Sequence, residues 1–145
     1  MAFMIRGAKL KKLGGKIRYL KEKPTRGEWI KKLDALIREI CFLRDHGRCQ
    51  WNCGKTEKLA PHHIKPKGRY TRMRWEIDNV LTLCYQHHLG NGGAHLDGTT
   101  FTEWFNITWP DRAVYLRRRA QIREGGSVDY RAIELYLLSQ LKKYE

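Results

Sequence analysis

Two things are scarce in this sequence: long apolar runs and acidic residues. No apolar stretch approaches the ~18–20 residues that a membrane-spanning helix requires, so we expect no segment that crosses a membrane. The apolar opening, residues 1–5, is too short for the core of a signal peptide, and a basic stretch stands where a cleavage site would follow. These absences predict an intracellular, cytoplasmic protein.

Acidic residues are outnumbered, because 29 Lys and Arg face 15 Asp and Glu and leave a formal net charge of +14. A net charge of this size indicates what the protein binds more than how it folds. The common polyanion inside a cell is nucleic acid. An anionic membrane surface would require a basic helix with a bulky apolar face, and the basic N-terminal residues offer only a thin apolar stripe. Five Trp, seven Tyr and four Phe supply the apolar bulk that a disordered polycation lacks. We therefore predict a folded protein that binds nucleic acid and no membrane.

The start of the chain predicts a basic arm and then a helix. Residues 1–24 are basic, are interrupted by Gly14 and Gly15, and have no strong period, so we expect them to pack loosely. Thr25 and Glu28 form a capping box, and apolar residues then recur at helical spacing for about four turns.

Residues 25–145 are expected to form one α+β domain. Its core, about 48–98, loses the helical period and concentrates Cys, His and Gly, with short strands at 59–64 and 80–83. A helical extension follows over 100–145. Further helices are expected at 85–89, at 101–105, at 108–123 and after a cap at Ser127 or Asp129. The prediction is a small metal-containing centre between N- and C-terminal helices.

The cysteines suggest a zinc site. Cys49-x3-Cys53 is followed, further along the chain, by Cys84-x2-His87, and two close pairs of soft ligands suit tetrahedral zinc. The alternatives are a disulfide, which an intracellular setting disfavours, or buried thiols. Cys41, far from these pairs, is expected to be a small buried hydrophobe.

The histidines suggest a second centre. His62-His63 and His87-His88 are adjacent pairs, and His95 follows soon after. Neighbouring side chains on a strand point to opposite faces, so one of His62 and His63 can ligate a metal while the other faces a substrate. On a helix, His87 and His88 would point about 100° apart, one toward the zinc knuckle and one toward a second ion.

These residues match a known pattern. Residues 60–64 (APHHI), residues 78–84 (DNVLTLC) and the His88 that follows His87 resemble the HNH endonucleases, whose catalytic unit is a ββα-metal motif. The resemblance covers about residues 48–98.

The resemblance implies a set of roles. His63 would be the general base, and His62 and His88 would bind the catalytic ion, with His95 as a further metal-binding His. Asn79 would either orient the loop of the base or ligate the metal. The structural zinc would be held by Cys49, Cys53, Cys84 and His87. The catalytic ion would be Mg²⁺, Mn²⁺ or another divalent cation, and imidazole ligands suit Mn²⁺, Ni²⁺ or Zn²⁺ better than Mg²⁺.

Basic residues near the motif are expected to contact DNA phosphates, although they could also form a solvated surface. They are Lys65, Lys67, Arg69, Arg72 and Arg74 between the two halves of the motif, and Arg117, Arg118 and Arg119 on a later helix. Trp51 and Trp75 are expected to pack in the core instead of stacking on bases.

The function expected from the resemblance is a divalent-metal-dependent DNA endonuclease, nicking one strand or cutting both. The resemblance also suggests a bacterial or phage-encoded enzyme of genome processing or recombination. The alternative is a zinc-knuckle protein that binds nucleic acid without cutting it, and such a protein would have no use for His63, Asn79 or His88. The pattern leaves open whether the protein is a monomer or a homodimer.

Overall fold

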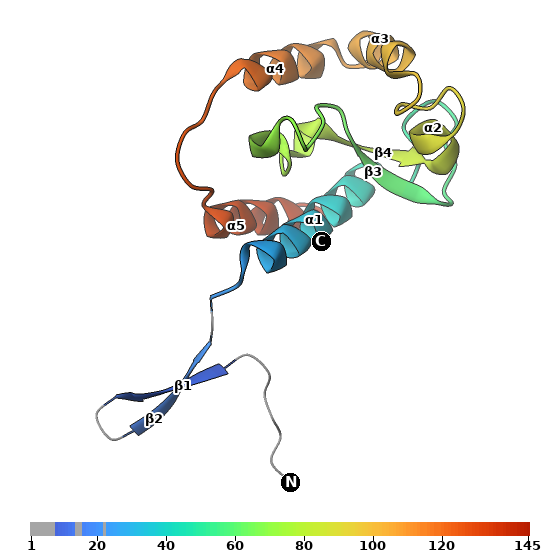
Figure 1. Ribbon diagram of the computed structural model, residues 1–145. Helices are drawn as coiled ribbons and strands as arrows, with labels where there is room; N and C mark the ends of the chain where they lie inside the picture. The colour runs from blue at the N-terminus through green and yellow to red at the C-terminus, as the bar shows by residue number, and fades with distance from the viewer. Residues whose placement is uncertain (1–7, 14–15, 22) are drawn as a thin grey trace. The chain divides into compact units, whose positions relative to one another are not determined.

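The computed structural model describes residues 8–13, 16–21 and 23–145 (Figure 1). Five α-helices and two antiparallel hairpins make up the described part, which is the α+β class that the sequence predicts. The chain divides into two compact units, the first ending at Lys31 and the second running from Lys32 to Glu145. None of the described helices is both long and apolar enough to cross a membrane.

The first unit contains a hairpin that the sequence analysis missed. Strand β1 (Ala8–Leu13) pairs antiparallel with β2 (Lys16–Lys21), and Leu13 lies opposite Lys16. The sequence analysis expected a loosely packed basic arm and predicted no strand in it, whereas these two basic strands satisfy each other's backbone groups. The rest of the predicted arm, residues 1–7, 14–15 and 22, lies outside the described residues.

Helix α1 (Arg26–Arg44) begins where its sequence predicts, directly after Thr25. The backbone N–H of Thr25 donates to the Glu28 carboxylate at 2.7 Å, and the backbone N–H of Glu28 donates to Oγ1 of Thr25 at 3.3 Å, so the capping box is confirmed. The helix buries Leu33, Ile37, Ile40 and Cys41, which confirms Cys41 as a buried residue.

Helix α5 (Tyr130–Leu141) packs beside α1. Its N-cap is Asp129, whose carboxylate accepts from the backbone N–H of Ala132 at 2.9 Å. Lys32 of α1 pairs with Glu134 of α5, a carboxylate that is buried and also paired with Arg131. This contact joins the two ends of the second unit.

A hairpin and a short helix form the centre of the second unit. Strand β3 (Leu59–His63) pairs antiparallel with β4 (Val80–Cys84), and α2 (Tyr85–Leu89) follows β4 directly. All five residues of β4 are buried. The predicted strands and this helix agree with the structure to within one residue at each end.

Helices α3 (Gly98–Thr108) and α4 (Pro110–Gln121) cover one side of the hairpin, opposite α1 and α5 (Figure 1). Phe101, Phe105 and Leu116 pack on Leu81 and Leu83 of β4. The loop between β3 and β4 contains two 3₁₀ turns, η1 (Thr71–Met73) and η2 (Ile77–Asn79). Helix α3 is longer than the single predicted turn because it begins at a cap on Asp97, whose carboxylate accepts from the backbone N–H of Thr100.

Candidate metal centres

Four donor atoms from two distant segments meet beside α2. They are the sulfur atoms of Cys49, Cys53 and Cys84 and a ring nitrogen of His87, all within 4.8 Å of one another. Nδ1 of His87 lies 3.3 Å from Sγ of Cys49 and 3.6 Å from Sγ of Cys84. The sulfurs of Cys53 and Cys84 are 3.8 Å apart. With Zn–S bonds of about 2.3 Å and Zn–N bonds of about 2.0 Å, a tetrahedral ion would separate its ligands by about 3.5–3.8 Å. This Cys3His cluster can therefore hold structural zinc.

Local backbone geometry builds the cluster. The N–H of Cys49 donates to the carbonyl of Lys55 at 2.8 Å and closes a tight turn, in which Asn52 and Gly54 have φ of +57° and +60°. Cys84 ends β4, and His87 follows in the first turn of α2. The four cysteines are free thiols, so the disulfide alternative does not hold.

The two most buried thiols of the cluster, those of Cys49 and Cys84, have pKa values shifted in opposite directions. Burial raises the pKa of Cys49 to about 12. Burial also opposes ionisation of Cys84, but hydrogen bonds from the backbone N–H of His87, from the Cys49 and Cys53 thiols and from the backbone N–H of Gln86 together outweigh it and lower the pKa of this thiol. These bonds favour the thiolate, which is the form that binds metal. The Trp51 ring lies 5.0 Å from the His87 ring and 5.3 Å from that of Trp104, and it packs against the core as predicted.

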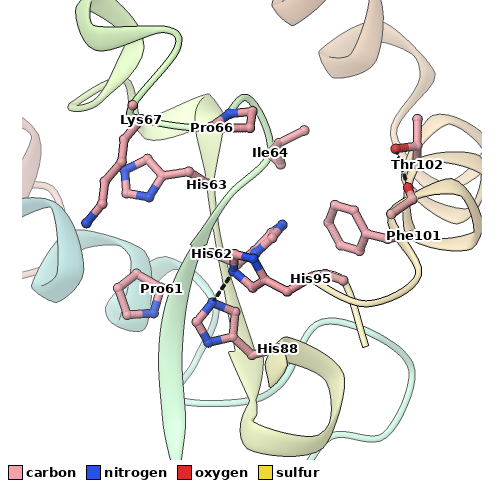
Figure 2. A pocket seen from close by; sticks show the side chains of 13 residues that line it. Pro61, His62, His63, Ile64, Pro66, Lys67, His88, His95, Phe101 and Thr102 are labelled. Atoms are coloured by element: carbon pink, nitrogen blue, oxygen red, sulfur yellow. Dashed lines mark hydrogen bonds between the residues drawn. The ribbon is translucent and has the colours of Figure 1, made fainter. Parts of the chain in front are cut away.

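Three further ring nitrogens meet at His88 of α2. His62, His88 and His95 each offer a donor atom within 4.8 Å of the others, and Figure 2 shows their rings facing one another. The two Nε2 atoms of His88 and His95 are 3.1 Å apart. Nδ1 of His62 is buried and has no hydrogen-bond partner in the described structure, which costs about 1–3 kcal/mol for a buried polar atom. Burial also lowers the pKa of His62 to about 3, so the ring is neutral. Converging imidazoles with one unpaired nitrogen fit a divalent cation.

Glycine in the loop after α2 brings His95 back to His88. The N–H of His95 donates to the carbonyl of His88 at 3.2 Å. Gly93 sits inside this turn, where a Cβ atom would lie 2.7 Å from the carbonyl oxygen of Gln86 and 2.8 Å from that of Gly90. Only glycine fits such a close approach.

His63 lines the same pocket as the three histidines. This pocket, of about 530 Å³, is also lined by Lys67 and Thr102 (Figure 2). Nε2 of His63 lies 2.9 Å from the carbonyl oxygen of Arg74, and because a carbonyl only accepts, Nε2 carries the proton and Nδ1 has the free lone pair. Burial lowers the pKa of His63, and the bond to Arg74 offsets only part of this effect. The ring is therefore neutral at pH 7.

Asn79 is fully buried and bonds at both ends of its side chain to backbone. Its Oδ1 accepts from the N–H of Lys65 at 2.7 Å. Its Nδ2 donates to the carbonyls of Lys65 and Met73, each at 3.0 Å. Of the two roles that the sequence left open, these bonds favour orienting the loop after His63 over ligating a metal.

No protein-family model, curated protein or solved structure matches the chain. What the structure does show is a small α+β chain with a Cys3His cluster near a β-hairpin that leads into a helix. The likeness to HNH endonucleases therefore rests on the residues and their arrangement alone.

Two arginines that the sequence analysis missed hold the backbone around Asn79. The Arg112 guanidinium donates to the carbonyls of Asp78 at 2.6 Å and Val80 at 2.8 Å. That of Arg44 donates to the carbonyls of Ile77 at 2.8 Å and Val80 at 2.7 Å. Burial lowers the pKa of Arg112 to about 10, which leaves it charged at neutral pH. No sequence motif marks such contacts with distant backbone carbonyls.

Three of the predicted phosphate-binding arginines have partners within the protein. Arg74 pairs with Asp34 at 2.6 Å, and Arg119 pairs with Glu76 at 2.5 Å and with Glu124 at 2.7 Å. Arg72 donates to the carbonyl of Gly125 at 3.2 Å. The phosphate contacts expected of Arg74 and Arg119 stay a prediction, and carboxylates already occupy part of both guanidinium groups. Among the residues that the structure describes, no carboxylate pairs with Lys65, Lys67, Arg69, Arg117 or Arg118.

Proposed function

We propose that the protein is a divalent-metal-dependent endonuclease that hydrolyses phosphodiester bonds in DNA. One observation carries the proposal: three imidazoles converge in the same pocket that contains His63, whose Nδ1 is free. A zinc-knuckle binding protein would need only the Cys3His cluster. It would have no reason to keep Nδ1 of His62 buried and unpaired.

The catalytic role of His63 follows from its hydrogen bond. Because Nε2 is held by the Arg74 carbonyl, Nδ1 is the atom that would accept a proton from the attacking water. Arg74 is itself held by Asp34 of α1. Asn79 fixes the loop that begins at Lys65, two residues after the base. The base is thus oriented by a chain of contacts that does not depend on substrate.

His62, His88 and His95 would hold the catalytic ion. When bound, a divalent cation would supply Lewis-acid stabilisation of the charge on the phosphate and on the leaving 3′ oxygen. A donor set of three imidazoles favours Mn²⁺, Ni²⁺ or Zn²⁺ over Mg²⁺. The Cys3His cluster would have a structural role, since it fixes the first turn of α2, on which His88 follows His87.

The partner is inferred from charge. A net charge of +14 favours a polyanion, and Lys67 lies at the pocket that contains the base. DNA is preferred within that class because of the likeness to HNH endonucleases.

Plasmid cleavage tests the proposal. We expect the wild type to convert supercoiled DNA to nicked or linear product with Mn²⁺ or Ni²⁺, and His63→Ala to cut about 10²–10⁴-fold more slowly while still binding DNA and metal. The control is His46→Asn, a change at an exposed histidine whose φ of +53° suits Asn, and it should cut like the wild type.

Two outcomes would contradict the proposal. Equal cutting by the wild type and His63→Ala would remove His63 as the base. DNA binding without cutting under any divalent ion would favour the zinc-knuckle binding protein instead.

A further inference from the structure

A second pocket, of about 390 Å³, lies beyond the loop that follows His63. One wall is the segment from Arg69 to Met73, and the other is the end of α4 and the residues just after it. We call it the arginine pocket, after Arg69, Arg72, Arg119 and Arg123, which line it. Four guanidinium groups in one hollow repel one another, so the pocket attracts an anion to the extent that the protein's own carboxylates do not offset their charge.

Two of these arginines are held in place by the protein. Arg119 is paired with Glu76 and Glu124. Arg72 donates to the carbonyls of Gly125 and Gly126, which are neutral acceptors, so its charge remains. Arg119 and its two carboxylates together carry a net charge of −1, which offsets part of the charge of the other arginines, whereas Arg72 is oriented but unpaired with any carboxylate among the described residues.

The other two arginines are available to a ligand. Arg69 and Arg123 are exposed, and neither forms an ion pair with the residues that the structure describes. The Arg69 guanidinium lies 5.5 Å from the centre of the Tyr70 ring, an arrangement that supports the side chain without satisfying its N–H donors. Planar guanidinium groups with free N–H donors suit phosphate oxygens.

The arginine pocket adjoins the histidine pocket along the chain. Pro66, Lys67 and Gly68 line the histidine pocket, and Arg69 begins the lining of the arginine pocket. Consecutive Cα atoms are about 3.8 Å apart, and a DNA strand presents one phosphate per about 3.4 Å of helix axis. Since the linings of the two pockets are consecutive in the chain, we infer that a strand with one phosphate at the histidines presents a neighbouring phosphate to the arginines.

We propose that the arginine pocket is a second phosphate site, which holds the backbone of the nucleic acid beside the bond that is cut. The ligand chemistry is a phosphodiester anion, and the choice of backbone over free phosphate rests on the proposed function. Because Arg119 is already paired with two carboxylates, Arg69, Arg72 and Arg123 would carry the interaction.

The test is a salt titration of DNA binding. In a His63→Ala background, binding of a fluorescent duplex is measured by anisotropy at several salt concentrations, for Arg69→Gln, Arg123→Gln and the double variant. The control is Lys142→Gln, which removes the same charge at the end of α5, outside both pockets. Circular dichroism and thermal unfolding check that each variant is folded.

The double variant should bind at least about tenfold more weakly, and the slope of log K against log salt should become shallower by about 0.9 for each phosphate that the protein no longer neutralises. Lys142→Gln should keep the parent slope. If the double variant keeps it too, the proposal is overturned. Titration with inorganic phosphate at constant ionic strength distinguishes a site for the nucleic-acid backbone from a site for free phosphate. If phosphate binds through Arg69 and Arg123 while DNA affinity ignores both, the pocket is a free-phosphate site and the backbone proposal fails.

Cleavage assays in the wild-type background keep the two proposals apart. A shallower slope in the double variant, with no cutting by the wild type, would support the arginine pocket and contradict the endonuclease. Cutting by the wild type, with an unchanged slope in the double variant, would support the endonuclease and contradict the arginine pocket.

Discussion

Both ends of the Asn79 side chain bond to backbone groups of the segment after β3. An amide is the side chain that can accept from the N–H of Lys65 and donate to two carbonyls at once. A carboxylate of the same shape only accepts, so it would face the carbonyls of Lys65 and Met73 with no proton between them. A positioning role at residue 79 therefore requires the amide, whereas a metal-binding role would also accept a carboxylate.

Asn79→Asp should therefore lower the free energy of unfolding by about 2–4 kcal/mol, because it leaves buried acceptors unpaired. Cleavage should fall with it, since the loop that follows His63 loses its anchor. Urea unfolding and the plasmid assay measure the two effects, with the exposed Asn106→Asp as a control expected within about 0.5 kcal/mol of the wild type. If Asn79→Asp were stable and cut at least as well as the wild type, this position would instead be identified as a metal ligand.

Asp34 holds Arg74, whose carbonyl accepts from His63, and the ionisation of Asp34 makes the stability of the protein depend on pH. Burial opposes its ionisation, but hydrogen bonds from Arg74 and Trp75 outweigh burial, so the pKa of Asp34 lies below its ordinary value of 3.8. A carboxyl with a lowered pKa in the folded state stabilises the protein above its unfolded pKa, and this contribution is lost as pH falls through the folded pKa.

Asp34→Asn should cost about 1 kcal/mol of unfolding free energy at pH 7, since the carboxylate is partly exposed. The difference between wild type and variant should stay constant from pH 7 to about 5 and shrink below the usual range of a carboxyl. Urea unfolding at pH 7, 5 and 3 measures it. A difference that did not change with pH would mean that packing, not charge, is what the aspartate contributes.

At the scale of elements, the Cys3His cluster joins the turn at residues 49–54 to the first turn of α2. The turn makes few apolar contacts of its own, because residues 52–54 are exposed. Helix α2 has only five residues, too short to be stable without tertiary contacts. A metal at this junction would therefore supply much of the local stability.

The protein should contain one equivalent of tightly bound zinc, and Cys53→Ser should lose it and lower Tm by about 10 °C or more. Metal content by mass spectrometry and thermal unfolding measure the two effects. Cys41→Ala is the matched control, since Cys41 is buried but lies outside the cluster; it should unfold at a lower temperature and keep the zinc. Full stability of Cys53→Ser without zinc would show that the cluster is not structural.

Elements with a strong local signal could be predicted from the sequence, and others could not. The capping box marked the start of α1, and the apolar run of residues 80–83 marked β4, which is buried throughout. The hairpin of β1 and β2 was missed although Gly14-Gly15 between two basic runs is typical of a two-residue hairpin. Apolar residues alternate only weakly in these lysine-rich runs, so the pattern did not predict strands. The predicted helix at 101–105 was shorter than α3, because the N-cap Asp97 follows a glycine-rich loop and was not recognised as a cap.

The candidate ligands could be predicted because the type and spacing of residues carry that information. Nothing comparable marks a side chain that bonds to a distant backbone carbonyl, and so Arg44 and Arg112 were missed. For the same reason the sequence did not reveal that Arg74 and Arg119, expected to contact phosphate, pair with the carboxylates of Asp34, Glu76 and Glu124. A count of charges in sequence shows how many are present but not which ones are paired.

The whole molecule keeps a large positive charge after these internal pairs are set aside, because each pair removes one charge of either sign from the same total of +14. If that charge is what holds a polyanion, DNA affinity must fall steeply with salt as counterions are released. For four or more phosphate contacts, raising salt from 50 to 200 mM should weaken binding by at least about 100-fold. Anisotropy with His63→Ala, without added metal, measures this free of cleavage. A change of less than tenfold would mean that the charge serves the folded chain and not a partner, and nucleic acid would no longer be the expected ligand.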